Sequence, residues 1–322
     1  MTDIPRPGAV PDEVNPMKTR GQMPRFRQIQ TEGIAEWCMA LPALLGLLLF
    51  IALPFLFAVV LSFTSLKMGS PLPTRFVGAE QYHRVLTAPS FQRALLNNAL
   101  FALAVVPLQT ASALGLALLL NIRLRGIAVF RTLFFMPVVF PMSLVAVIWT
   151  LIYAPGPGGM MNSLMALVSG GNLGPWDYLH TKVLALPAII VMSVWQGVGF
   201  QMVVLLGGLQ SIPAVLYEAA VIDRAGKWGC FCHVTLPRLR NHLIFTALVT
   251  TILAFRLFDQ VRIMTRGGPD NATTTVMFEA VRAVFERQQV GAASAMTVIF
   301  FLIVLGITRL QRMLVREERE IS

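Results

Sequence analysis

Cys230, Cys232 and His233 lie close together and are of the residue types that bind metal ions. On a helix, however, residues two apart point to nearly opposite sides, and the sequence contains no second group of such ligands. With Cys38, the chain has three cysteines, which is too few for a disulfide framework. We therefore predict no metal site and interpret the thiols as buried or interfacial side chains.

Residues that could catalyse a reaction are not grouped either. No glycine-rich segment is followed by Lys and then Ser or Thr, as in loops that hold nucleotide phosphates. No single segment contains a His/Asp/Ser constellation or a paired-carboxylate constellation of the kind that catalysis uses. The sequence therefore predicts a protein that is not an enzyme and that binds no cofactor of its own.

The composition indicates a membrane environment. Apolar residues make up 56% of the chain, charged residues 13%, and the mean hydropathy is +0.68, whereas soluble domains carry about 25% charge. The net charge of +10 would suggest nucleic acid in a soluble protein, but basic membrane proteins are usually basic because of their cytoplasmic flanks. No arginine-rich helix with interleaved aromatic residues is present, so we expect no nucleic-acid partner.

The apolar stretches of the sequence predict the helices that would position any functional residue. A spanning helix needs about 20 apolar residues, and we expect an all-α membrane protein with six such helices, at residues 38–63, 99–120, 132–153, 183–209, 243–261 and 288–307. Internal prolines such as Pro137 and Pro141 are tolerated where neighbouring helices satisfy the freed carbonyls. Residues 1–35 are expected to be a flexible basic tail, residues 36–315 one transmembrane domain, and residues 316–322 a short charged tail.

The distribution of Lys and Arg predicts the orientation. With both termini inside the cell, fifteen of these residues lie on the cytoplasmic side and ten on the outer side, and positive charge favours the cytoplasmic side. Four aromatic residues would then form part of an outer aromatic belt: Trp149, Tyr153, Trp176 and Tyr178.

The predicted cytoplasmic segment 211–238 has an unusual pattern. Ser211 and Pro213 suit the start of a helix, and strong helix formers follow up to Asp223. Gly226 interrupts this run, a second short apolar run follows, and we expect Pro237 to end it. Two short helices with small alanines on one face could form a compact surface for docking another protein, or an amphipathic loop lying among lipid headgroups.

These residues resemble the EAA loop of permease subunits of binding-protein-dependent ABC importers of type I. The resemblance rests on Glu218-Ala219-Ala220, Asp223, Ala225, Phe231 and Leu236-Pro237. In that family the loop docks onto the ATPase, which implies a coupling role for Glu218, Ala219, Ala220, Asp223, Arg224, Ala225, Leu236 and Pro237. Arg224 departs from the pattern, because the family usually has glycine there, and glycine permits backbone angles that arginine resists.

A second set of residues resembles the fifth outer loop and sixth helix of MalF-type carbohydrate permeases. It includes Phe258-Asp259-Gln260, the outer-loop motif Gly267-Gly268-Pro269, and residues 291–296. The resemblance implies uptake of sugars, oligosaccharides, polyols or glycerol phosphates across a bacterial cytoplasmic membrane. The implied partners are a second, related permease subunit, a dimer of ATPase subunits that bind ATP and Mg, and an extracytoplasmic solute-binding protein.

Polar residues inside the predicted spans are candidates for a substrate path. They are Gln109, Gln196, Gln201, Arg256 and Asp259. Arg256 and Asp259 are three residues apart, so they could share a helix face and neutralise each other, or could merely anchor the outer end of the helix. Gln196 follows Trp195, which offers a stacking surface for sugars, and precedes Gly197 and Gly199, which permit close approach. Gln109 could instead link two helices.

The alternative function is that of a secondary transporter or channel that works without an ATPase. Such proteins usually contain internal repeats with interrupted helices, and the sequence shows no convincing repeat.

Overall fold

The computed structural model describes residue 37 and residues 39–71, 73–122 and 125–316, with side chains up to Met313. The chain divides into two units, Met1–Leu56 and Phe57–Ser322. The predicted tails lie outside the described residues except for Arg316, which ends the last helix, and Cys38 also lies outside them.

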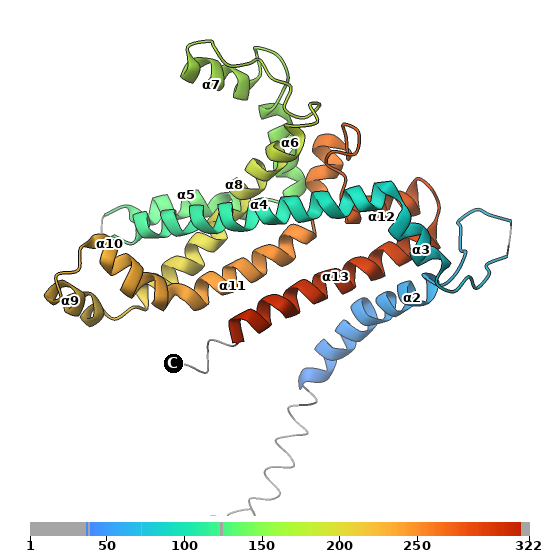
Figure 1. The fold of residues 1–322 in the computed structure, drawn as a ribbon, viewed down its shortest axis with the longest axis horizontal. Helices are drawn as coiled ribbons and strands as arrows, with labels where there is room; N and C mark the ends of the chain where they lie inside the picture. Colours follow the sequence, from blue (N-terminus) through green and yellow to red (C-terminus); the bar gives the residue numbers. More distant parts are fainter. Residues whose placement is uncertain (1–36, 38, 72, 123–124, 317–322) are drawn as a thin grey trace, which may run out of the picture. The chain divides into compact units, whose positions relative to one another are not determined.

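The described residues are mostly helical, which confirms the predicted all-α class, and their one β feature is an isolated bridge between Thr64 and Phe76. We call residues 211–238 the coupling segment, after their predicted role. Before it, the helices of the second unit are α3 (Glu80–Thr87), α4 (Pro89–Leu120), α5 (Ile127–Val139), α6 (Met142–Ile152), α7 (Met160–Ser169) and α8 (Ala185–Gln210). After α8 come α9 (Ala214–Ile222), α10 (Lys227–Cys230), the π-turn η2 (Phe231–Thr235), α11 (Leu236–Phe255), the π-turn η3 (Val261–Thr265), α12 (Val276–Phe285) and α13 (Val290–Arg316). The π-turn η1 (Leu48–Ala52) belongs to the first unit, and α2 (Leu53–Leu61) crosses the division (Figure 1).

Four helical stretches in the described residues are long and apolar enough to cross a membrane: Met39–Leu61, Pro89–Leu120, Ala185–Gln210 and Val290–Met313. A fifth exists if α5 and α6 together make one span. The remaining predicted span, residues 243–261, corresponds to α11, which does not meet the same condition because it begins with Arg238, Arg240 and other polar residues.

The predicted continuous helix over residues 132–153 was wrong in shape. Helices α5 and α6 meet at 100°, with the break at Phe140 and Pro141. A proline disfavours helical angles in the residue before it, and Phe140 accordingly has an extended ψ of 140°. Pro137, by contrast, remains inside α5.

The core of the second unit consists of two groups of buried side chains on the same long helices. One group surrounds Phe91, Ile189 and Phe278. The other surrounds Ala117, Met202, Leu205 and Leu239 near the coupling segment. Helix α4 packs along α8 and α11, and Figure 1 shows the axes of α4, α11 and α13 similarly oriented, with α11 running opposite to the other two. These helices therefore connect the coupling segment at one end to the 256–289 region at the other.

Candidate functional site

Helix α9 is the most exposed helix of the coupling segment. The Ser211 N–H continues the hydrogen bonding of α8 to the carbonyls of Gly207 and Gly208, at 3.2 and 3.3 Å, and α9 begins after Pro213. No residue of α9 is buried. Glu218 and Ala219 are exposed, and the side chain of Ile222 is 81% exposed. The predicted coupling residues therefore lie on an accessible surface, as docking requires.

The turn after α9 explains how Arg224 replaces glycine. Arg224 has a φ of +59°, in the left-handed region that favours glycine. Its N–H donates to Val221 O at 3.0 Å, and the Ala225 N–H donates to Ala220 O at 2.9 Å. These two bonds make a Schellman motif, the usual way a helix ends at a left-handed residue. The arginine thus adopts the backbone angles that glycine would take, and the turn is kept.

The second short helix does not end at Pro237 as predicted. Helix α10, η2 and α11 follow one another with helical angles at Cys230 and Thr235, so the chain is helical from Lys227 to Phe255. Proline cannot donate a hydrogen bond and crowds the carbonyl one turn earlier. The wide turn η2, closed by the bond from Leu236 N–H to Phe231 O, lies directly before Pro237 and accommodates it without a break.

Few side-chain contacts join the parts of the coupling segment to one another. The hydroxyls of Tyr217 and Thr235 are 3.1 Å apart, and the rings of Trp228 and Phe231 stack at 5.4 Å. The Trp228 side chain remains 75% exposed. Cys230 and Cys232 are half-buried, and no group of metal-binding side chains occurs in the described residues. The segment thus presents an apolar surface, with Val221, Ile222 and Trp228, beside the charges of Glu218 and Asp223.

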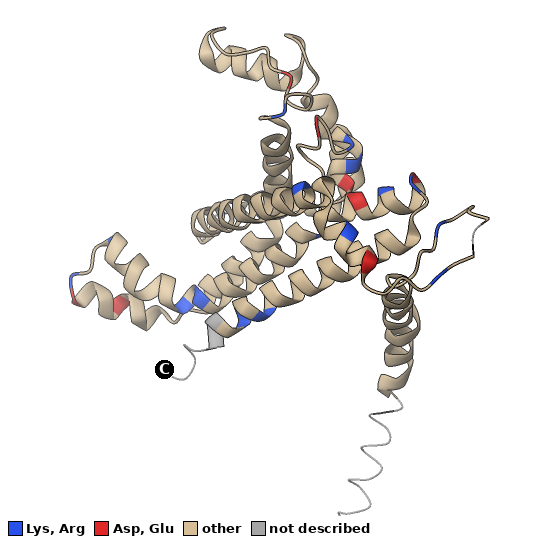
Figure 2. Cartoon of the chain, turned by 45° about the vertical axis from the view of Figure 1, so that its right-hand side comes forward, with Lys and Arg blue, Asp and Glu red and all other residues tan. Residues whose placement is uncertain are grey.

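A cavity of about 490 Å³ brings together all five polar residues predicted as candidates for a substrate path, Gln201 among them. Gln109 comes from α4, Gln196 from α8, and Arg256 and Asp259 from the segment that follows α11. The charges in the described residues lie away from the middle of the long helices: α4 has none after Arg93, α11 none after Arg240, and α13 none before Arg309 (Figure 2). The cavity lining is thus mainly apolar and amide, with one charge of each sign.

Gln201, which was predicted, and Ser193, which was not, give this cavity further hydrogen-bonding capacity. Gln201 donates from Nε2 to Thr250 Oγ1, and the structure describes no partner for Gln201 Oε1 or for Ser193 Oγ, although both atoms are buried. Buried polar atoms normally have partners. Gln201 and Ser193 therefore offer free hydrogen-bonding groups to a polar solute. Ser193 was not predicted from the sequence, because serine is common in helix interfaces.

Several details of the predicted path were wrong. Helix α11 ends at Phe255, so Arg256 and Asp259 do not share a helix face, and no ion pair joins them in the part of the chain described. A side chain at Gly199 would meet the backbone of Phe134 at 2.1 Å, so this glycine permits helix packing rather than solute approach. Gly197 makes room for the amide of Gln109, since a Cβ there would lie 2.5 Å from its Nε2.

The aromatic residues form a cluster rather than a belt. Ring centroids are 5.6 Å apart for Trp195 and Trp149, 5.2 Å for Trp149 and Tyr153, and 5.2 Å for Tyr153 and Tyr178. Trp149 and Tyr153 are 8% and 2% exposed, so they pack in the core instead of facing headgroups. Trp195 is not among the residues lining the 490 Å³ cavity, and it packs edge-to-face against Trp149.

The outer-loop motif is part of a closely bonded structure. Gly267 has a φ of +81°, and a side chain there would lie 2.6 Å from the ring of Phe278. Thr273 Oγ1 donates to Gly268 O at 2.8 Å. Gly267 and Gly268 therefore serve the fold of the loop, with Pro269 accepting a bond from Ala272 N–H at 2.8 Å.

Two asparagines of α4 hold this loop in place. Asn97 Nδ2 donates to the carbonyls of Asn271 and Thr274, both at 2.9 Å. Asn98 Oδ1 accepts from Val276 N–H at 2.9 Å. Both asparagines are almost completely buried. Neither asparagine was predicted, because the predicted span began at residue 99, although two adjacent asparagines directly before an apolar run were a usable signal.

A family model for the inner membrane component of binding-protein-dependent transport systems matches residues 111–320. The chain belongs to this family. It is 34% identical over 273 residues to the trehalose/maltose transport system permease protein MalF of Thermococcus litoralis, covering 84% of this chain and 90% of that protein. It is 31% identical over 298 residues to the diacetylchitobiose uptake system permease protein NgcF of Streptomyces coelicolor, covering 89% and 84%.

A solved structure supports the fold of this permease. A chain of a bacterial ABC transporter that imports the acidic polysaccharide alginate matches with a TM-score of 0.77 at 18% identity, covering 92% of this chain and 99% of that one. The predicted membership in the MalF-type permeases is confirmed. The roles of the coupling, cavity and outer-loop residues stay predictions.

Proposed function

We propose that this permease carries a sugar or a related solute by alternating access, driven by ATP hydrolysis in separate ATPase subunits that dock on residues 211–238. A second, related permease subunit and an extracytoplasmic solute-binding protein complete the machine. The named activities of the relatives, trehalose/maltose transport and diacetylchitobiose uptake, support this class of solute.

The observation that carries the proposal is the continuity between the coupling segment and the cavity. Helix α8 lines the cavity with Gln196 and Gln201 and ends at Gln210, and three residues separate its end from the start of α9. The helix that starts at Lys227 continues through η2 and lines the same cavity with Thr250. A displacement of the coupling segment would therefore move two walls of the cavity together.

The chemistry of the cavity favours an uncharged, hydroxyl-rich solute. Its volume lies within the range of small-molecule sites, and amides and hydroxyls give orientation without charge. Arg256 and Asp259 are its two charged residues and balance each other. A glycerol phosphate would need an excess of positive charge, which the described lining of this subunit does not supply.

Docking on the coupling segment can be tested with Ile222→Glu in the assembled, reconstituted importer. Because burying an unpaired carboxylate in an interface is costly, we expect association with the ATPase to weaken by more than about tenfold. ATPase activity stimulated by the solute-loaded binding protein should fall with it. Phe285→Glu is the matched control. Phe285 and Ile222 have similar exposed fractions, 77% and 81%, and Phe285 lies in α12, at the other end of the long helices. Equal losses in both variants would argue against docking at α9.

Co-purification separates the importer from the secondary transporter or channel. A tagged chain should bring down an ATPase and a second permease subunit from its native membrane. If transport persists in vesicles containing the tagged chain without any ATPase, the alternative function is correct.

The cavity can be tested independently with Gly197→Ala. The added methyl group would displace the Gln109 amide, so we expect the apparent affinity for solute to fall about tenfold, as for the loss of one or two hydrogen bonds. Gly207→Ala on the same helix is the control, because a side chain there meets nothing within 4 Å. Unchanged solute affinity in Gly197→Ala would remove Gln109 from the solute site.

A further inference from the structure

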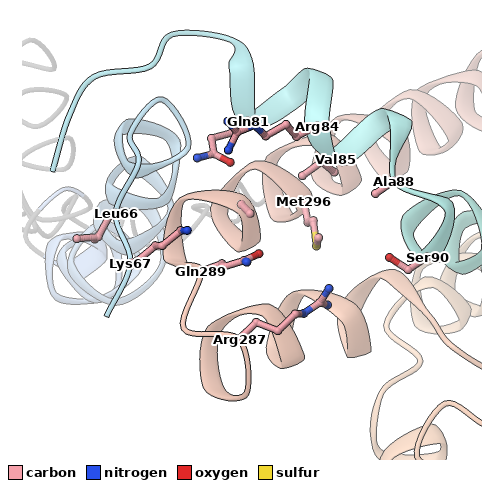
Figure 3. Close-up of a pocket in the computed structure, with 11 residues that line it drawn as sticks. Leu66, Lys67, Gln81, Arg84, Val85, Ala88, Ser90, Arg287, Gln289 and Met296 are labelled. Carbon is pink, nitrogen blue, oxygen red and sulfur yellow. The ribbon is translucent and has the colours of Figure 1, made fainter. Parts of the chain in front are cut away.

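A second pocket, of about 220 Å³, lies away from the proposed solute cavity and has a different character. Its walls come from residues 66–67, from α3 and the first turn of α4, and from the segment that starts α13. In Figure 3 the Lys67 amine, the Arg287 guanidinium and the Ser90 hydroxyl lie around a common space, with Met296 on its wall. The pocket thus combines cationic and apolar groups.

The cations of this pocket are not matched by carboxylates in its lining. Lys67, Arg84 and Arg287 line it, and no Asp or Glu does. Arg84 pairs with Glu80 at 2.5 Å on the exposed side of α3, and Arg287 pairs with the buried Glu279 at 2.5 Å. None of the ion pairs between described residues involves Lys67. Lys67 is therefore the cation available to an anionic ligand.

The position of the pocket along the helices indicates the membrane surface. The apolar span of α13 begins at Val290, and Arg287 precedes it. Met296 lies six residues into the span, or about 9 Å at the rise of an α-helix. The cationic groups thus lie just outside the span and an apolar wall extends just inside it, which is the order of phosphate and acyl chain in a phospholipid.

We propose that this pocket binds the phosphate group of an anionic phospholipid, with its acyl chain against Met296 and Ala292. Lys67 supplies the charge, Ser90 and Gln289 can donate hydrogen bonds, and Arg287 retains N–H groups beyond the one that contacts Glu279. A free phosphate could use the same polar groups but gains nothing from the apolar wall. Basic pockets between membrane helices on the cytoplasmic side hold lipid headgroups, and this pocket, on the predicted outer side, has the same combination of cationic and apolar groups.

The test measures lipid binding to the purified full importer in detergent, with phosphatidylglycerol, phosphatidylcholine and inorganic phosphate as separate probes. We expect phosphatidylglycerol to bind more tightly than phosphatidylcholine. Lys67→Gln should weaken its binding about fivefold, the effect of one charge near a lipid surface. Arg93→Gln is the matched control, because Arg93 is exposed on α4 close to Ser90 but does not line the pocket. Ala292→Leu fills the apolar side without changing charge and should also weaken lipid binding.

Each outcome decides the assignment. Weaker binding in Lys67→Gln and Ala292→Leu, with Arg93→Gln unchanged and thermal unfolding of all three unaltered, supports a lipid site. Equal losses in Lys67→Gln and Arg93→Gln would show general charge attraction and overturn it. Competition by inorganic phosphate at the same concentration, with no effect of Ala292→Leu, would assign the pocket to a free anion instead.

Discussion

The two ends of the long helices are built in opposite ways. At one end, the region 256–289 is fastened by buried side chains, among them Asn97, Asn98 and Glu279. At the other end, the coupling segment has no buried residue in α9, and its side-chain bonds, such as Tyr217 to Thr235, are few. Regions with few buried contacts open and adapt most easily.

This difference predicts separate roles for the 256–289 region and the coupling segment. The 256–289 region holds Arg256 and Asp259 at the edge of the cavity, and a fixed loop keeps their positions constant. The coupling segment offers exposed apolar side chains such as Val221 and Ile222, which the proposed docking of the ATPase would cover. Substitutions at the first end should therefore change stability, and those at the second should change coupling.

The largest expected contrast is between Glu279→Ala and Glu218→Ala. Glu279 is 1% exposed and contacts Arg287 at 2.5 Å, Arg282 at 3.3 Å and the Thr274 hydroxyl at 3.0 Å. Breaking a buried ion pair costs about 3–5 kcal/mol, and because both arginines are about a third exposed we expect about 3 kcal/mol, measured by thermal unfolding in detergent. Glu218→Ala should leave the unfolding temperature unchanged and lower ATPase stimulation.

Glu286→Ala is the control for the first of these variants. Glu286 contacts Arg282 and Arg262 at 3.0 and 3.3 Å at the surface, and hydrogen bonds from Arg282 and Arg262 hold its pKa below the usual range. Exposed ion pairs contribute little to stability. If Glu286→Ala lowers the unfolding temperature as much as Glu279→Ala, buried ion pairs are not what makes the 256–289 region more stable than the coupling segment.

A smaller difference in the free energy of unfolding is expected between Gly267→Ala and Gly226→Ala. A methyl group at Gly267 would meet the Phe278 ring at 2.6 Å and would be held at a φ of +81°, so we expect a loss of about 2 kcal/mol. Gly226 has a φ of −71°, and a side chain there meets nothing within 4 Å. Gly226 is also the N-cap of α10, a position where alanine is less favourable than glycine. This loss offsets the entropic gain of about 0.5 kcal/mol from replacing a glycine, so the substitution should be nearly neutral. Similar unfolding temperatures for the two variants would show that the loop can move away from the added methyl group.

Much of the fold was predictable because it follows from local patterns. Long apolar stretches predicted the positions of α4, α8 and α13, and polar residues within or beside the predicted spans predicted five of the residues that line the cavity. The break between α5 and α6 depends on Pro141, which sequence rules permit either to be tolerated or to end a helix. The sequence alone did not distinguish the two outcomes.

The missed features depend on residues far apart in the chain. Asn97 contacts carbonyls 174 and 177 residues away, and no local pattern predicts such bonds. Pro237 continues a helix only because η2 widens the preceding turn, which requires knowledge of the backbone rather than of residue types. The exposure of α9 does not follow from its pattern either, because the apolar Val221 and Ile222 are exposed while Leu216 and Ala220 are half-buried.

The smallest expected effect is that of Arg224→Gly, and it tests whether the coupling segment depends on its backbone or on its charge. A left-handed residue other than glycine costs about 1–2 kcal/mol, and glycine also gains freedom in the unfolded chain, so we expect a net stabilisation of less than about 1 kcal/mol. Because the Schellman bonds at 3.0 and 2.9 Å involve only backbone atoms, transport should be unchanged. Arg224→Gln keeps the left-handed strain and removes the charge. If Arg224→Gly and Arg224→Gln both reduce ATPase stimulation at unchanged stability, the guanidinium contacts the ATPase; if neither does, the arginine replaces glycine without adding a contact.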